Sequence, residues 1–305
     1  MKPQPLSKFA VAQTRARLKR VIAAVRFATR HPQDPETAHD LRVAIRRFSQ
    51  CLRMFEGLFE ERLAEKMLKR GRKLLHLCGA KRDYDVGLQL LADAGLPPHS
   101  SVLLKFREQR DRGERALVRY LGKKSTRDDA SRWRKRLRPS AHPGGKLDWS
   151  SGVAENARRM MPELVGEFFN AGDAAMEARG DYEVLHQFRL RAKHLRYALE
   201  VFEPAYGAPL KTGLLALRGL QDRMGAINDC VVVLALPGMD RAAARAVRKL
   251  LVAREAAFRE YWSKTFSPRA RTAWVRLLTH PGGRVKLPEA PSEPSHRKRK
   301  SAHPA

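Results

Sequence analysis

The sequence predicts an all-α protein built from two similar four-helix bundles that arose by internal duplication. Apolar residues recur at spacings of three and four over most of the 305 residues, and stretches of alternating polarity typical of strands are absent. Proline- and glycine-rich stretches separate these periodic segments. A hydrophobic content of 43% is sufficient for a packed core.

The first half of the chain contains four of the predicted helices. They cover residues 6–30, 36–56, 58–78 and 99–121. The second of them follows "HPQDPET", where Asp34 or Thr37 can cap its first turn. The stretch "GLPPHSS" precedes the last of them. We therefore expect residues 1–122 to form the first helical-bundle repeat.

The second half repeats this organisation and adds a short helix at its end. The predicted helices cover residues 152–178, 182–203, 208–227, 240–266 and 269–279. Asp181 can cap the helix that follows it, and "EPAYGAP" and "LPGMD" mark two of the turns. We expect residues 152–280 to form the second repeat, and the two repeats together to form one domain.

Two segments lie outside the predicted bundles. Residues 123–151 are basic and rich in proline, glycine and serine, which is typical of a linker. Residues 281–305 contain too few apolar residues to fold, so we expect a disordered basic tail.

The charge of the chain indicates a polyanionic partner. The sequence contains 61 Lys and Arg residues against 32 Asp and Glu residues, a net charge of +29. A protein with this excess repels itself unless a polyanion neutralises it, which suggests nucleic acid, an anionic membrane or inorganic polyphosphate. An aromatic content of 7% is low for a protein that stacks single-stranded bases.

The location and cofactors are inferred from what the sequence lacks. No stretch approaches 18 consecutive apolar residues, and the first 30 residues lack the apolar core of a signal peptide. The three cysteines have no CxxC spacing and fall at apolar helical positions, which indicates buried thiols. We therefore expect a cytoplasmic protein with no membrane partner, no metal and no cofactor.

Two similar segments support the duplication. "HDLRVAIRRF" begins at His39 and "HQFRLRAKHLRY" at His186, and "LCGAKRDYDV" and "MGAINDCVV" follow them at nearly the same distance. The aligned pairs include Arg42 with Arg189, Arg46 with Lys193, and Asp83 with Asp229. Two such blocks in helical hairpins predict halves that face each other about an approximate twofold axis.

In both repeats the basic residues fall on one face of a helix. At about 100° per residue, Arg42, Arg46 and Arg53 lie within roughly 40° of each other, opposite the apolar face. Arg189, Lys193 and Arg196 form the same pattern in the second repeat. Like charges four residues apart destabilise a helix slightly, so their presence in both halves favours a polyanion site over a solvated outer face. His39 and His186 can form structural hydrogen bonds or donate to phosphate.

These segments resemble the CHAD domain, the conserved histidine α-helical domain, over about residues 6–280. The resemblance rests on the two histidine segments, their separation and the two segments that follow. It implies two four-helix bundles related by a pseudo-twofold axis, with basic helices lining a central groove or cavity. It also implies binding of inorganic polyphosphate and association with polyphosphate granules. Carried onto this sequence, it indicates His39, Arg42, Arg46, Arg53, Lys69, Arg72, Lys73, Arg82, His186, Arg189, Lys193, Arg196, Lys211 and Arg218 as binding residues.

The two repeats differ at positions that bear on function. Asn228 occupies the position equivalent to Arg82, and Glu200 the position equivalent to Arg53, so the halves need not bind equally. Some members of the family carry a fused triphosphate-tunnel domain of the CYTH type, but its ExExK signature is absent here, as is a phosphate-cradling P-loop. We therefore expect non-catalytic binding.

Two alternatives follow from the same sequence. A nucleic-acid-binding protein would use the same excess of positive charge, although helix-turn-helix, zinc-finger and RNP patterns are absent. A metal-dependent phosphohydrolase could use Asp83 or Asp229, but we expect these carboxylates and Asp85 to follow helix ends, where capping or pairing with arginine is the simpler role. The expected partner is polyphosphate, with at most weak, non-specific binding of nucleic acid.

Overall fold

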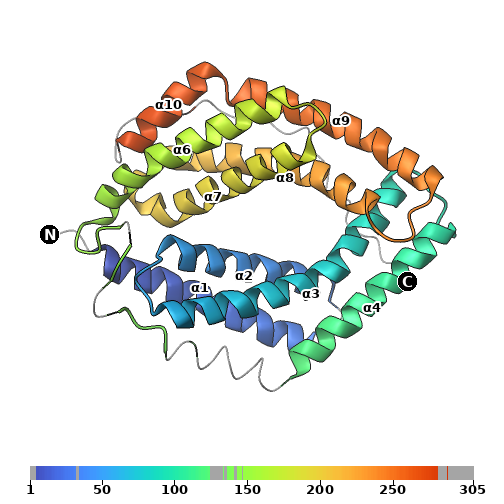
Figure 1. Ribbon diagram of the computed structural model, residues 1–305, viewed down its shortest axis with the longest axis horizontal. Helices are drawn as coiled ribbons and strands as arrows, with labels where there is room; N and C mark the ends of the chain where they lie inside the picture. The colour runs from blue at the N-terminus through green and yellow to red at the C-terminus, as the bar shows by residue number, and fades with distance from the viewer. Residues whose placement is uncertain are drawn as a thin grey trace.

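The computed structural model describes residues 5–31, 34–123, 133, 136–140, 143–145, 147–280 and 287, and within them the fold is all-helical (Figure 1). Its helices are α1 (Leu6–Arg30), α2 (Pro35–Met54), α3 (Glu61–Asp93), α4 (Ser101–Gly122), α6 (Val153–Glu177), α7 (Tyr182–Tyr206), α8 (Pro209–Leu234), α9 (Arg241–Thr265) and α10 (Pro268–Thr279). The only β-type pairing in the described residues consists of two isolated bridges. The all-α prediction is confirmed.

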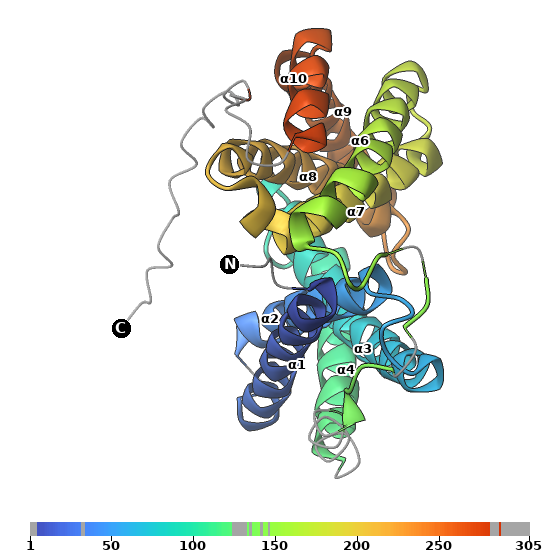
Figure 2. The ribbon, with the colours of Figure 1, turned by 90° about the vertical axis from the view of Figure 1, so that its left-hand side faces the viewer.

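The helices pack in the same order in the two halves. In the first half α1 packs on α2, α2 on α3 and α3 on α4; in the second, α6 packs on α7, α7 on α8 and α8 on α9, and α10 lies against α6. Figures 1 and 2 show the halves as two layers, with α2 and α3 of the first facing α7 and α8 of the second. The halves meet where α2 contacts α7 and α3 contacts α8. This repeated order is consistent with bundles derived from a duplication.

Side-chain caps begin several helices where the sequence places them. Asp34 accepts a hydrogen bond from the backbone N–H of Glu36 at 2.8 Å. Asp181 accepts from the N–H groups of Glu183 and Val184 at 3.0 and 3.1 Å. Both aspartates thus satisfy amides that a helix start leaves unpaired. Thr37, the alternative cap, instead donates to the carbonyl oxygen of His31.

Two helices are longer than the sequence predicts. α3 runs through Gly79 to Asp93 rather than ending near residue 78, and α8 runs through Gly225 to Leu234 rather than ending near 227. Buried apolar residues continue at helical spacing beyond both glycines, and a glycine costs a helix only about 1 kcal/mol relative to alanine. The prediction that the carboxylates after these glycines follow helix ends is therefore wrong, because Asp83, Asp85 and Asp229 lie inside α3 and α8.

The linker packs against the first half. Trp133 and Leu137 are buried in the core, and Arg15 donates to the carbonyl oxygen of Leu137 at 3.1 Å. Gly57, with a φ of 85°, lies so close to the linker backbone that a Cβ at this position would overlap the carbonyl of Gly144. The predicted tail, residues 281–305, lies outside the described residues except for the buried Leu287.

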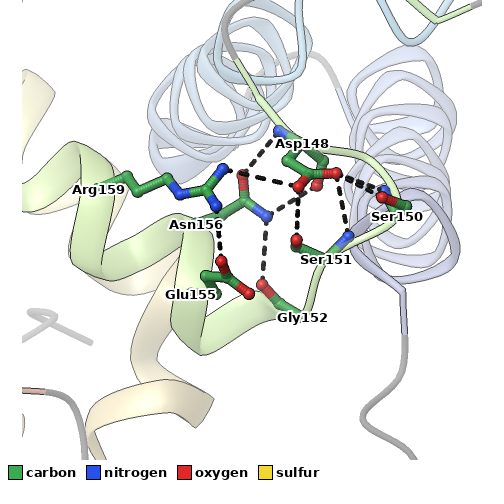
Figure 3. Close-up of polar contacts among 7 residues, drawn as sticks. All are labelled: Asp148, Ser150, Ser151, Gly152, Glu155, Asn156 and Arg159. Atoms are coloured by element: carbon green, nitrogen blue, oxygen red, sulfur yellow. Dashed lines mark hydrogen bonds and ion pairs between the residues drawn. The ribbon is translucent and has the colours of Figure 1, made fainter.

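The end of the linker is fixed to the start of α6 by a hydrogen-bonded group around Asp148 (Figure 3). The Asp148 carboxylate accepts from the backbone and the hydroxyl of both Ser150 and Ser151, and these bonds lower the pKa of the carboxyl. Asn156 of α6 accepts from the Asp148 N–H at 2.9 Å and donates to its carbonyl at 2.8 Å. These contacts position the first turn of α6 against the linker.

The described cysteines agree with the expected buried thiols. Cys51, Cys78 and Cys230 are buried free thiols. No described helix combines the length and the apolar character that crossing a bilayer requires.

Candidate functional site

The contact between α2 and α7 brings basic residues of the two repeats together. Arg42 and Arg46 lie one turn apart on α2, and Arg189 and Lys193 lie one turn apart on α7. We call these four residues the central cluster. The charge of Arg46 disfavours the protonated forms of both Arg42 and Arg189, which places Arg46 among basic residues of both halves. The sequence predicted that these residues lie on facing helices of the two repeats, and the structure brings them together.

The central cluster is partly removed from water. All four side chains are half-buried. Burial is the largest cause of the lowered pKa values of Arg42 and Arg189, followed in each case by the charge of Arg46. Burial of like charges without compensation is unfavourable, so an anion that enters here gains more than it would at an exposed surface.

Lys193 is the most perturbed residue of the central cluster. Burial, together with the charges of its arginine neighbours, lowers the pKa of its amine from 10.5 to about 7. These neighbours are Arg189, Arg46, Arg196 and Arg42, in order of decreasing effect. The amine of the free protein is therefore about half protonated at neutral pH.

Two carboxylates lie close to the central cluster, one from each repeat. The positive charge of Arg42 lowers the pKa of Asp83, and that of Arg189 lowers the pKa of Asp229. Burial is the larger effect and raises the pKa of both carboxyls above the ordinary value. A Cβ on Gly79 would lie 3.8 Å from Arg42 Nη1 and 4.0 Å from Asp83 Oδ2, so Gly79 lies beside both side chains. Among the described residues no ion pair within 4 Å joins either carboxylate to the central cluster, which leaves it cationic.

Two hydrogen-bond donors at this interface have no hydrogen-bond acceptor in the described structure. The Nε atoms of Arg189 and Arg196 are buried without a hydrogen-bond partner. An unsatisfied buried donor costs about 1–3 kcal/mol, so both positions favour a ligand that supplies oxygen acceptors.

An acidic residue, Glu200, lies beside arginines of both α2 and α7 at this interface. Glu200 lies 3.8 Å from Arg47 Nε of α2 and 3.7 Å from Arg196 Nε of α7, and it therefore joins the two halves electrostatically. The guanidinium of Arg196 also lies over the Tyr197 ring, at 5.1 Å. Glu200 replaces the repeat equivalent of Arg53, so this difference between the repeats falls at their interface.

The structure does not bring the remaining predicted residues into the central cluster. Exposed side chains belong to His39, Arg53, Lys69, Arg72, Lys73, Arg82, Lys211 and Arg218, and His186 is half-buried. Lys73 lies 5.3 Å from the Tyr120 ring centroid, on the side of α3 that faces α4. Neither imidazole forms a hydrogen bond with the described residues. The role of this outer set stays a prediction.

A cleft of about 1060 Å³ opens at the end of the interface where α3 and α4 approach α8 and α9. Arg82 and Asp229 line it, which connects it with the central cluster, because Arg82 is the main charge acting on Asp229. Both basic and acidic side chains line its walls, and Nζ of the buried Lys81 lies 3.5 Å from Oε1 of Glu114. The sequence analysis did not find this cleft, although Lys81 directly precedes Arg82 in "KRDYD".

Arg254 of α9 is a further residue of the cleft that sequence reasoning missed. Its Nη1 donates to the carbonyl oxygen of Ala226 at 2.9 Å and lies 3.2 Å from Cys230 Sγ. Its charge also acts on Asp229. No group of three or more His, Cys, Asp or Glu side chains suited to a metal ion occurs among the described residues.

Comparisons with known proteins agree with this architecture. The solved structures similar to the chain include "PptA from Streptomyces chartreusis", 19% identical with a TM-score of 0.59 over 85% of this chain and 100% of that one. They also include the CHAD domain of the plant Ricinus communis, 23% identical with a TM-score of 0.57 over 91% of this chain and 93% of that one. At these identities the likeness concerns the fold, and no curated protein matches the chain. The family model described as CHAD domain matches residues 11–237, so the chain belongs to the CHAD domain family.

Proposed function

We propose that this protein binds inorganic polyphosphate without breaking it down, through the central cluster, and that it associates with polyphosphate granules. The observation that carries the proposal is the convergence of half-buried cations from two repeats with no ion-paired acid among them in the described structure. The free protein holds this repulsion within its own interface. A polyanion relieves the repulsion and supplies acceptors for the buried donors of Arg189 and Arg196.

Polyphosphate suits the geometry of the site better than nucleic acid does. Arg42 and Arg46 are one turn apart, about 6 Å along the helix, so successive phosphates of a slender chain can meet successive side chains. The half-buried position between two helical layers favours such a chain over a duplex. Base stacking requires accessible aromatic rings, and the only exposed aromatic residue in the described chain is Phe27, on α1.

The chemistry of the side chains is consistent with binding rather than catalysis. Arginine presents a planar fork that takes two phosphate oxygens at once, and lysine supplies a mobile charge. The carboxylates of Asp83 and Asp229 interact electrostatically with Arg42 and Arg189, and burial favours the neutral forms of both carboxyls. The proposal therefore assigns them a structural role in positioning arginines, and no step of phosphoryl transfer.

The decisive experiment measures binding of long-chain polyphosphate, duplex DNA and RNA at equal phosphate concentration over a series of salt concentrations. We expect polyphosphate to bind most tightly and its affinity to fall steeply with salt, as counterion release requires. Stronger binding of either nucleic acid would favour the rival function. Release of phosphate from polyphosphate in the presence of Mg²⁺ or Mn²⁺, lost in Asp83→Asn or Asp229→Asn, would show an enzyme instead.

A double variant locates the site. Arg42→Glu with Arg189→Glu removes one arginine of the cluster from each repeat, and we expect a loss of polyphosphate affinity of at least about 100-fold, since charge-assisted contacts contribute about 1.5–3 kcal/mol each. Arg26→Glu with Arg158→Glu makes the same change of charge at exposed positions of α1 and α6. An equal loss in both variants, each with an unchanged helical signal, would mean that overall charge and not the cluster binds the ligand.

A further inference from the structure

Lys193 is surrounded by arginines from two helices. Arg189 and Arg196 lie about one turn before and after it on α7, and Arg42 and Arg46 approach it from α2. The ion pairs of the described residues do not include Lys193. The carboxylates of Asp83, Asp229 and Glu200 interact electrostatically with Arg42, Arg189 and Arg196, respectively. The Lys193 amine therefore lies among arginines proposed to bind phosphate and forms no ion pair with a carboxylate of the described residues.

This environment makes the amine a nucleophile at neutral pH. A lysine with the ordinary pKa of 10.5 is neutral in fewer than about one molecule in a thousand at pH 7, whereas the pKa of Lys193, about 7, leaves about half of the amine neutral. Burial and neighbouring cations are the means by which reactive lysines are generally activated. An exposed lysine such as Lys69 has no such environment.

We propose that Lys193 is a site of covalent acylation by acyl phosphates, with the arginines around it holding the phosphoryl group. The inference rests on the proposed binding of phosphate by the central cluster. The lone pair of the neutral amine attacks the acyl carbon, forming an N–C bond, while the bond from that carbon to the phosphate oxygen breaks. The amine proton leaves with inorganic phosphate as hydrogen phosphate, so the reaction needs no further reactant. The product is a neutral amide at the centre of the site.

The size of the anion determines whether the amine stays reactive. A phosphate monoester or acyl phosphate carries about two negative charges, fewer than the positive charges of the four arginines around Lys193, so the amine remains in a cationic environment. Long polyphosphate brings many more charges and favours the protonated, unreactive ammonium. Polyphosphate therefore protects Lys193, and acylation in turn removes one cation from the polyphosphate site.

The test uses the full chain, acetyl phosphate as the reagent, and peptide mass spectrometry to give an acetylation rate for each lysine. At pH 7.5 we expect Lys193 to react at least about tenfold faster than the exposed residues Lys8 and Lys19, which serve as controls in the same molecule. The rate at Lys193 should level off above about pH 8, where its amine is already neutral. Inorganic phosphate and long polyphosphate should each slow Lys193 selectively.

A second reagent separates the arginine cradle from simple nucleophilicity. An N-hydroxysuccinimide acetate carries no phosphate, so the preference for Lys193 should shrink severalfold with this reagent. If the preference is equal with both reagents, the arginines do not hold the acyl donor and the inference is wrong.

The inference and the proposed function fail in different ways. A protein that binds polyphosphate but acetylates Lys193 no faster than Lys8 overturns the inference and leaves the proposed function standing. A protein that acetylates Lys193 rapidly but does not bind polyphosphate overturns the proposed function and supports the acylation site. Both measurements are made on the unmodified wild-type chain, so neither depends on the folding of a variant.

Discussion

The affinity for polyphosphate should depend on pH through Lys193. In the free protein burial and four arginines hold the pKa of this amine at about 7. A bound polyanion favours the charged form and moves the pKa back toward its ordinary value of 10.5. Binding therefore takes up a proton above pH 7, and the affinity falls as the pH rises.

The size of the effect follows from proton linkage. With pKa values of about 7 in the free protein and 10.5 in the complex, the affinity should fall about 20-fold between pH 7.5 and pH 9. At pH 8 the complex should take up about 0.9 proton more than the free protein.

Titration calorimetry in two buffers of different ionisation enthalpy measures both quantities at constant ionic strength. Lys193→Met preserves the length of the side chain and removes the titrating group, so its affinity should be nearly independent of pH over the same range. If the wild type and Lys193→Met show the same slope, or if no proton is taken up at pH 8, Lys193 does not face the bound polymer and the reasoning is refuted.

Three further outcomes follow from the contacts. Lys193→Met should raise the free energy of unfolding by about 1–3 kcal/mol at pH 6, where the native state must hold the ammonium, and by less at pH 9. Because the pKa of this amine is lower in the folded state, the stability of the wild type should rise from pH 7 toward pH 10. Urea titrations that show no such rise would contradict this. Glu200→Gln should strengthen polyphosphate binding severalfold at low salt by releasing Arg47 and Arg196, and an unchanged salt series would show that Glu200 does not compete with the ligand. Asp181→Ala should lower stability by about 1 kcal/mol in urea denaturation, while Asp181→Ser, which keeps a capping oxygen, should retain most of it.

Most of the fold could be predicted from the sequence because the signals that specify helices are local. The apolar spacing predicted every helix of the described chain, and the aspartates before 182–203 and 36–56 act as caps as expected. The early ends predicted for α3 and α8 came from treating Gly79 and Gly225 as breaks. Packing against neighbouring helices outweighs the small helical penalty of glycine, and no local signal reveals that packing.

The site was only partly predictable for a related reason. Helical periodicity identified Arg42, Arg46, Arg189 and Lys193 as one-sided within each repeat, but it does not determine which faces meet. Arg46 acts on residues of both halves, and this depends on how α2 crosses α7. The cleft that includes Lys81 and Arg254 combines five helices from the two halves, and its residues are too far apart in the chain to form a motif.

Both repeats contribute residues to the central cluster, and this affects how the molecule unfolds. Each repeat supplies only part of the cationic group, so an anion seated there tethers the two bundles across their seam. Saturation with polyphosphate should then raise the melting temperature of the whole molecule. The occupied protein would act as a single mechanical body, and a fragment holding one bundle would lose nearly all of its capacity for the polymer rather than half.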